Sequence, residues 1–138
     1  MAKNTTPAYV ITGQIAQAEL TAAVTDSSSA AAATLLYTFP TDDAKLYVVR
    51  FINSQVTQAA SSAMIAKVWF TDNSGTTLYL FEEGLMAAAT RSGTVKGATV
   101  DIIFDKVIQA GVKIYVAISV RAGVQDNVAV TLLGAKYV

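Results

Sequence analysis

Hydrophobic and polar residues alternate along much of this chain with a period of two, which is typical of β-strands because successive side chains point to opposite faces. The clearest stretch is 111–122, where every second residue is a β-branched hydrophobic one. These residues are Val112, Ile114, Val116, Ile118 and Val120. Shorter alternating stretches lie at 100–105 and 128–133. We therefore predict half-buried strands in all three places, each with one face in a hydrophobic core.

Other apolar runs have no polar face. Residues 46–52, 64–70 and 78–81 are rich in β-branched and aromatic side chains, and such short runs favour strands over helices. Apolar residues on both faces indicate burial on both faces, one by the core and one by a neighbouring molecule. Residues 34–39 form a further predicted strand, which Pro40 and the polar turn 41–45 bring to an end.

Turn residues separate these runs at the spacing of an all-β sandwich. The sequence Asp72-Asn73-Ser74-Gly75 predicts a hairpin loop with Gly75 in the left-handed conformation. About eight or nine strands result, so the predicted fold is an antiparallel β-sandwich of the jelly-roll kind. We expect residues 1–8 to form an N-terminal arm, disordered when free, and residues 9–138 to form a single β-sandwich domain.

Two stretches leave the secondary structure open. Residues 16–24 are rich in alanine and could form a helix or an edge strand, and residues 83–90 could contain a helical turn.

The chain carries few charges for its size. It has 10 Lys and Arg and 10 Asp and Glu in 138 residues, so that 14% are charged and 53% are hydrophobic. Ordinary soluble domains have about 25% charged residues, which keep the surface hydrated. A surface with fewer charges is typical of a subunit that is covered by partners, so we predict a homo-oligomer within a larger assembly.

Composition also excludes several classes of chemistry. Without His or Cys, the chain has no Ser-His-Asp or Cys-His arrangement, no zinc site and no disulfide. Glu82 and Glu83 would point to opposite faces of an extended segment, which is poor geometry for acid–base catalysis. Asp42, Asp43 and Asp72 lack the spacing of a calcium loop. We therefore expect no enzyme activity, no cofactor, no metal and no small-molecule substrate.

The formal net charge is zero, so the basic surface that binds nucleic acid or a membrane is missing. No apolar run is long enough to span a bilayer. The N-terminus has no apolar segment after Lys3, so we expect no secretion by a signal peptide.

Two charged residues stand inside apolar strands and are candidates for an interface. Arg50 and Lys67 could reach the surface along their aliphatic stems, or they could pair with a carboxylate across a subunit contact. The sequence leaves both alternatives open.

Aromatic residues supply the other interface candidates. Aromatic side chains at these spacings usually anchor a core or an interface, although they could also form a platform on which a sugar stacks. The candidates are Tyr9, Trp69, Tyr79, Phe81 and Tyr115, with Phe70 beside them.

The order of segments along the chain resembles a known class of virion proteins. The segments are the opening residues 4–11, "LLYTFPTDDAKLYVVRFINSQV", "KVWFTDNSGTTLYLF", "DIIFDKVIQAGVKIYVAISV" and the closing "VAVTLLGAKY". In order, composition and length they are similar to the capsid decoration (cement) proteins of tailed bacteriophages, which have β-sandwich or jelly-roll folds and are often trimeric. No catalytic residues belong to that class.

The resemblance implies a structural subunit that binds the outside of a phage capsid lattice and stabilises it. It also implies a trimer, the major capsid protein as partner, and a location in the virion, which assembles in the host cytoplasm. A tail, neck or fibre-associated virion protein is an alternative. A carbohydrate-binding β-sandwich module is an alternative of another class, because a fold does not fix a function.

Overall fold

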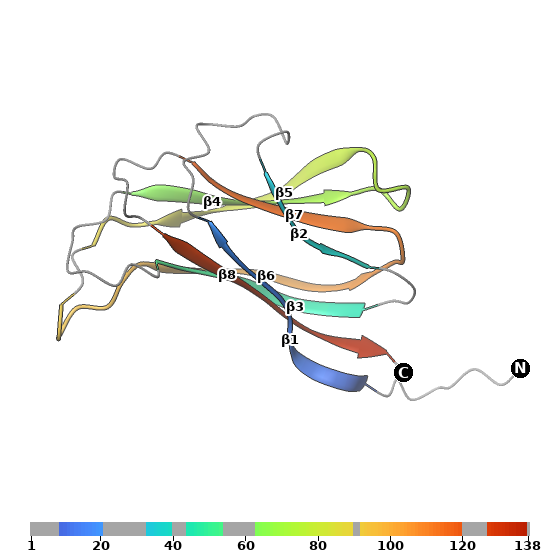
Figure 1. The fold of residues 1–138 in the computed structure, drawn as a ribbon, viewed down its shortest axis with the longest axis horizontal. Coiled ribbons are helices and arrows are strands. Elements are labelled where there is room, and N and C mark those ends of the chain that lie inside the picture. Colours follow the sequence, from blue (N-terminus) through green and yellow to red (C-terminus); the bar gives the residue numbers. More distant parts are fainter. Residues whose placement is uncertain are drawn as a thin grey trace, which may run out of the picture.

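A computed structural model of the protein describes residues 9–20, 33–39, 44–53, 63–89, 92–119 and 127–137. These residues form eight strands and pack as two layers (Figure 1). The strands are β1 (Tyr9–Leu20), β2 (Thr34–Thr38), β3 (Ala44–Asn53), β4 (Met64–Thr71), β5 (Leu78–Met86), β6 (Thr99–Ile108), β7 (Lys113–Ser119) and β8 (Val128–Tyr137).

The strand order is that of a jelly roll. One sheet, here called sheet A, has the order β1-β8-β3-β6, and the other, sheet B, has the order β2-β7-β4-β5. All pairings are antiparallel. The first strand pairs with the last, the second with the seventh, the third with the sixth and the fourth with the fifth, as in a long hairpin rolled over on itself. The predicted antiparallel, jelly-roll-like sandwich is confirmed.

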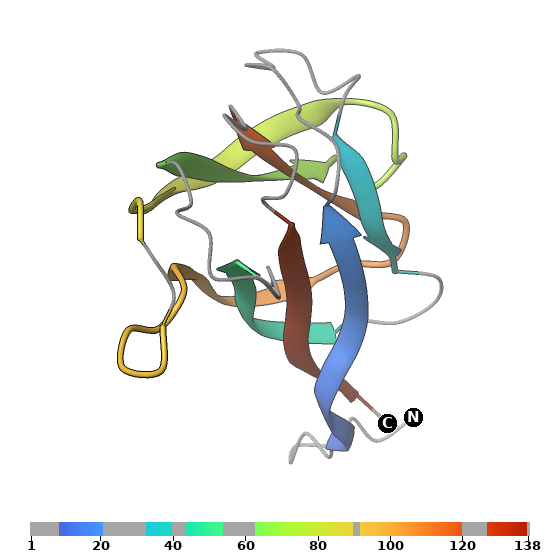
Figure 2. The same ribbon diagram turned by 60° about the vertical axis from the view of Figure 1, so that its left-hand side comes forward.

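Figure 2 shows the sandwich from a second side, with β1 and β8 adjacent in one layer and β4, β5 and β7 in the other. At one side of the sandwich β1 approaches β2, and at the other side β5 approaches β6. The second approach is close, because a Cβ atom added at Gly84 would lie 2.7 Å from Val100 Cγ2. Glycine at this position therefore allows the edges of the two sheets to meet.

The two ambiguous stretches are extended where the structure describes them. Residues 16–20 belong to β1, which forms an edge of sheet A, and residues 83–86 belong to β5. Residues 87–89 contain no helical turn. The predicted arm 1–8, the turn 40–43, and residues 21–24 and 90 lie outside the described residues.

The core lies between the sheets and follows the alternation of the sequence. In β7 the residues Ile114, Val116 and Ile118 are fully buried, as their spacing predicts. Val49 and Phe51 of β3 face them from sheet A and are also fully buried. Each of these strands therefore directs one apolar face into the core, where burial stabilises the fold by about 25 cal/mol for each Å² of apolar surface.

Three phenylalanines join the two sheets at the β5–β6 side. Phe104 of β6 lies 5.4 Å from Phe70 of β4 and 4.9 Å from Phe81 of β5, measured between ring centroids. Phe70 and Phe81 also meet edge to face at 5.3 Å. Such geometries add about 0.5–1.5 kcal/mol per pair beyond the burial of area.

The hairpin between β4 and β5 has the predicted loop. Gly75 has a φ of 74°, which is the left-handed conformation expected from the sequence. The Asp72 carboxylate accepts hydrogen bonds from the Ser74 hydroxyl at 2.8 Å and from the Thr76 amide at 3.0 Å. These bonds, with that of Ser74 first, hold the pKa of Asp72 below its ordinary value.

Candidate interaction surfaces

The outer face of sheet B carries a row of apolar side chains that crosses all four strands. Tyr115 of β7 pairs with Leu35 of β2 on one side and with Trp69 of β4 on the other. Trp69 in turn pairs with Leu80 of β5. The row faces outward because the residues that adjoin Leu35, Trp69 and Tyr115 on at least one side are buried in the core, namely Leu36, Val68, Ile114 and Val116. Leu35 is 46% exposed and Leu80 is 52% exposed, whereas Trp69 is buried.

A second apolar pair lies farther along the same face. Ile65 of β4 pairs with Leu85 of β5, and Leu85 is 67% exposed. Of the eight large hydrophobic residues that are exposed in the described part of the chain, five belong to sheet B. We call the outward-facing apolar set the sheet B band, and it consists of Leu35, Ile65, Trp69, Leu80, Leu85 and Tyr115.

An ion pair lies between the two parts of the sheet B band. Lys67 and Glu83 are cross-strand neighbours, and their Nζ and Oε1 atoms are 3.4 Å apart. The Lys67 side chain is 11% exposed, so most of its stem is covered. Glu82 pairs instead with the buried Val68, which places it on the other face from Glu83, as predicted for an extended segment.

The outer face of sheet A has a polar row at its centre. The row consists of Gln17, Thr131, Arg50 and Asp101, one residue from each strand. Arg50 donates two hydrogen bonds to the Asp101 carboxylate, from Nε at 2.8 Å and from a terminal nitrogen at 3.1 Å. This bidentate contact raises the pKa of Arg50 and lowers the pKa of Asp101. Both side chains remain more than one third exposed.

Both charged candidates therefore have carboxylate partners within the chain. Arg50 pairs with Asp101 across β3 and β6, and Lys67 pairs with Glu83 across β4 and β5. From the sequence we considered a carboxylate partner across a subunit contact but not these partners within the chain. They could not be identified there, because the register between strands determines which residues become cross-strand neighbours. Whether Arg50 and Lys67 also contact a partner stays a prediction.

The Arg50–Asp101 ion pair predicts how the free energy of unfolding changes at acidic pH. Because the pKa of Asp101 is lowered in the folded state, the pair contributes stability above the unfolded-state pKa of about 3.9, and this is lost as the pH falls through the folded-state pKa. We expect Asp101→Asn to destabilise the protein slightly at pH 7 and to have less effect near pH 2. Urea unfolding at a series of pH values checks this, with Arg50→Gln as the matched variant. A difference from wild type that stays constant over the whole pH range would contradict the prediction.

Of the aromatic candidates, Trp69 and Tyr115 lie side by side on the outer face of sheet B, and the others lie elsewhere or are not described there. Tyr79 is 59% exposed on β5, whereas Phe81 on the same strand packs against the core phenylalanines. Trp69 is buried and Tyr115 is half-buried. Tyr9 begins β1, where its backbone pairs with Tyr137, and its side chain lies outside the described residues. The described rings thus form no flat exposed platform for a sugar.

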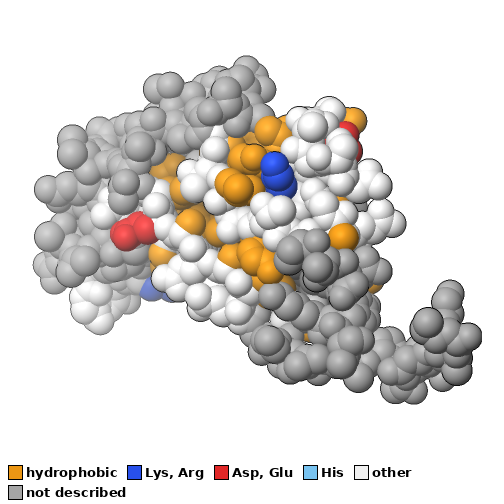
Figure 3. Space-filling view, turned by 45° about the vertical axis from the view of Figure 1, so that its right-hand side comes forward, with side chains coloured by type: hydrophobic (Ala, Val, Ile, Leu, Met, Phe, Trp, Pro, Cys, Tyr) orange, Lys and Arg blue, Asp and Glu red, His pale blue; other side chains and the backbone are white. Residues whose placement is uncertain are grey.

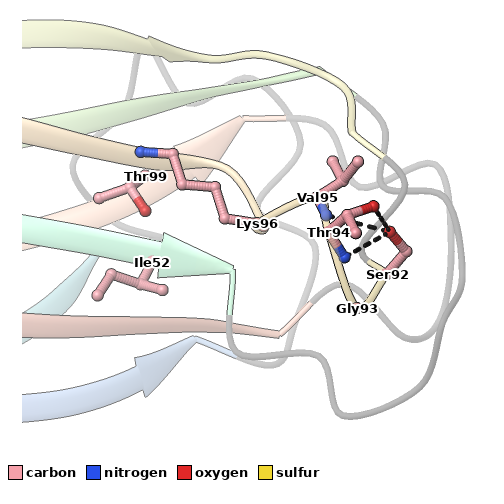
Figure 4. Close-up of a pocket in the computed structure, with 8 residues that line it drawn as sticks. Ile52, Ser92, Gly93, Thr94, Val95, Lys96 and Thr99 are labelled. Carbon is pink, nitrogen blue, oxygen red and sulfur yellow. Dashed lines mark hydrogen bonds between the residues drawn. The ribbon is translucent and has the colours of Figure 1, made fainter.

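Among the residues that the structure describes, two hollows differ in their lining. A cavity of about 490 Å³ lies between the loop 92–97 and the strand residues Ile52 and Thr99. In Figure 4, Lys96 extends from this loop toward Thr99 and away from Ser92. The Ser92 hydroxyl accepts hydrogen bonds from the amides of Thr94 at 3.2 Å and Val95 at 3.1 Å. These polar groups hold the loop together, which is sufficient to explain their presence.

The other hollow, of about 340 Å³, is mainly apolar. It is lined by Phe70, Phe81, Val107, Ile108 and Val112, with Thr71, Asn73 and Gln109 at its polar side. Among the residues that the structure describes, no group of three or more His, Cys, Asp or Glu is placed to hold a metal ion.

The surface view agrees with the low charge content. On the face shown in Figure 3, apolar side chains form several groups between polar ones, and charged side chains are few. No helix in the described ranges is long and apolar enough to cross a membrane.

Comparison of the chain with protein-family models, with curated proteins and with solved structures finds no match. The inference of function therefore rests on the fold, the surfaces and the composition.

Proposed function

We propose that the protein is a structural, non-catalytic subunit of a tailed-phage virion that binds the outside of the capsid lattice as a decoration protein. The observation that carries the proposal is the combination of a jelly-roll sandwich with an exposed apolar band on one sheet and few charges overall. The resemblance of the segment order to decoration proteins of tailed phages supports the same conclusion.

The mechanism is mechanical stabilisation through binding. A subunit that bridges joints between capsid proteins binds the assembled lattice and not its separated parts, so binding shifts the equilibrium toward the assembled state. Each copy buries apolar surface against the lattice, and the part of this gain that exceeds the entropy lost on association appears as binding affinity. Many identical copies on one shell together resist the pressure of the packaged DNA.

The arrangement of the carboxylates supports a role without catalysis. Asp101 is engaged by Arg50, Glu83 is paired with Lys67, and Glu82 lies on the opposite face of its strand from Glu83. None of these three carboxylates lines either of the two hollows described above.

The experiment compares particles of the encoding phage with and without the gene for this chain. We expect particles that lack the protein to lose DNA at a lower temperature, and we expect added purified protein to bind them saturably and restore wild-type heat resistance. Purified tails and a glycan array serve as parallel binding targets. Failure to bind capsids would overturn the proposal, binding to tails alone would favour the tail, neck or fibre alternative, and binding to glycans alone would favour a carbohydrate-binding module.

A further inference from the structure

We draw no further inference here: the strongest candidate, the mainly apolar hollow of about 340 Å³ that Phe70, Phe81 and Val107 line, has only uncharged side chains around it, which suit any small neutral molecule or an apolar side chain of a partner equally well, and nothing in the structure shows what fills it.

Discussion

Replacement of Phe104 by alanine is expected to lower the free energy of unfolding by about 3–5 kcal/mol. Phe104 is buried and its ring contacts Phe70 and Phe81, so it joins sheet A to two strands of sheet B. Alanine removes the apolar contacts and leaves a cavity that the two sheets cannot close without moving. Typical domains have 5–15 kcal/mol of stability, so this loss is a large share of the total. Equilibrium unfolding in urea, followed by circular dichroism, measures it.

The adjacent residue provides a matched control on the same strand. Ile103 points away from the core and is 70% exposed, so Ile103→Ala should change the free energy of unfolding by about 0.5 kcal/mol or less. A milder variant, Phe104→Leu, should lie between the two because it keeps most of the apolar volume. Equal losses for Phe104→Ala and Ile103→Ala would show that Phe104 does not connect the sheets as described.

The strands could be predicted where burial on one face imposes a period of two. In β7 the alternation gave both the element and its buried face, because Ile114, Val116 and Ile118 all lie in the core. In β1 the residues 16–20 have good helix formers, and the choice between helix and edge strand stayed open. In the structure, backbone hydrogen bonding to β8 makes these residues a strand. The partner residues lie more than 100 positions away in the sequence, so a local pattern does not reveal the pairing.

The candidate surface could be predicted only in part. The runs 64–70 and 78–81 are apolar on both faces, which indicated a second covered face and corresponds to the sheet B band. However, we selected interface candidates for their aromatic character, so Phe81 was included and Leu80 and Leu85 were not. Phe81 lies at the register shift of β5 and packs into the core, while Leu80 is exposed. A bulge changes which side chains face outward, and its position depends on the pairing of strands.

Replacement of Gly111 by alanine is expected to destabilise the fold by about 1–3 kcal/mol. Gly111 lies in the turn between β6 and β7 with a φ of 89°, which L side chains rarely adopt. A Cβ atom there would also overlap the carbonyl oxygen of Asn73 in the β4–β5 loop. The turn cannot easily move away, because the Gly111 amide donates a hydrogen bond to the Phe39 carbonyl at 2.8 Å. Thermal and urea unfolding measure the loss.

Two other glycines make this prediction specific to the turn. At Gly93 an added Cβ atom meets nothing within 4 Å, so Gly93→Ala should be neutral or slightly stabilising because it restricts the unfolded chain. The loss of stability for Gly75→Ala should lie between those for Gly93→Ala and Gly111→Ala. The φ of Gly75 is also positive, but the atom nearest to an added Cβ, at 3.1 Å, is Cε of the flexible Lys113 side chain. We therefore expect the loss of stability to increase from Gly93 to Gly75 to Gly111. If Gly111→Ala unfolds at the same denaturant concentration as Gly93→Ala, the contact between the two loops is not the constraint that the structure indicates.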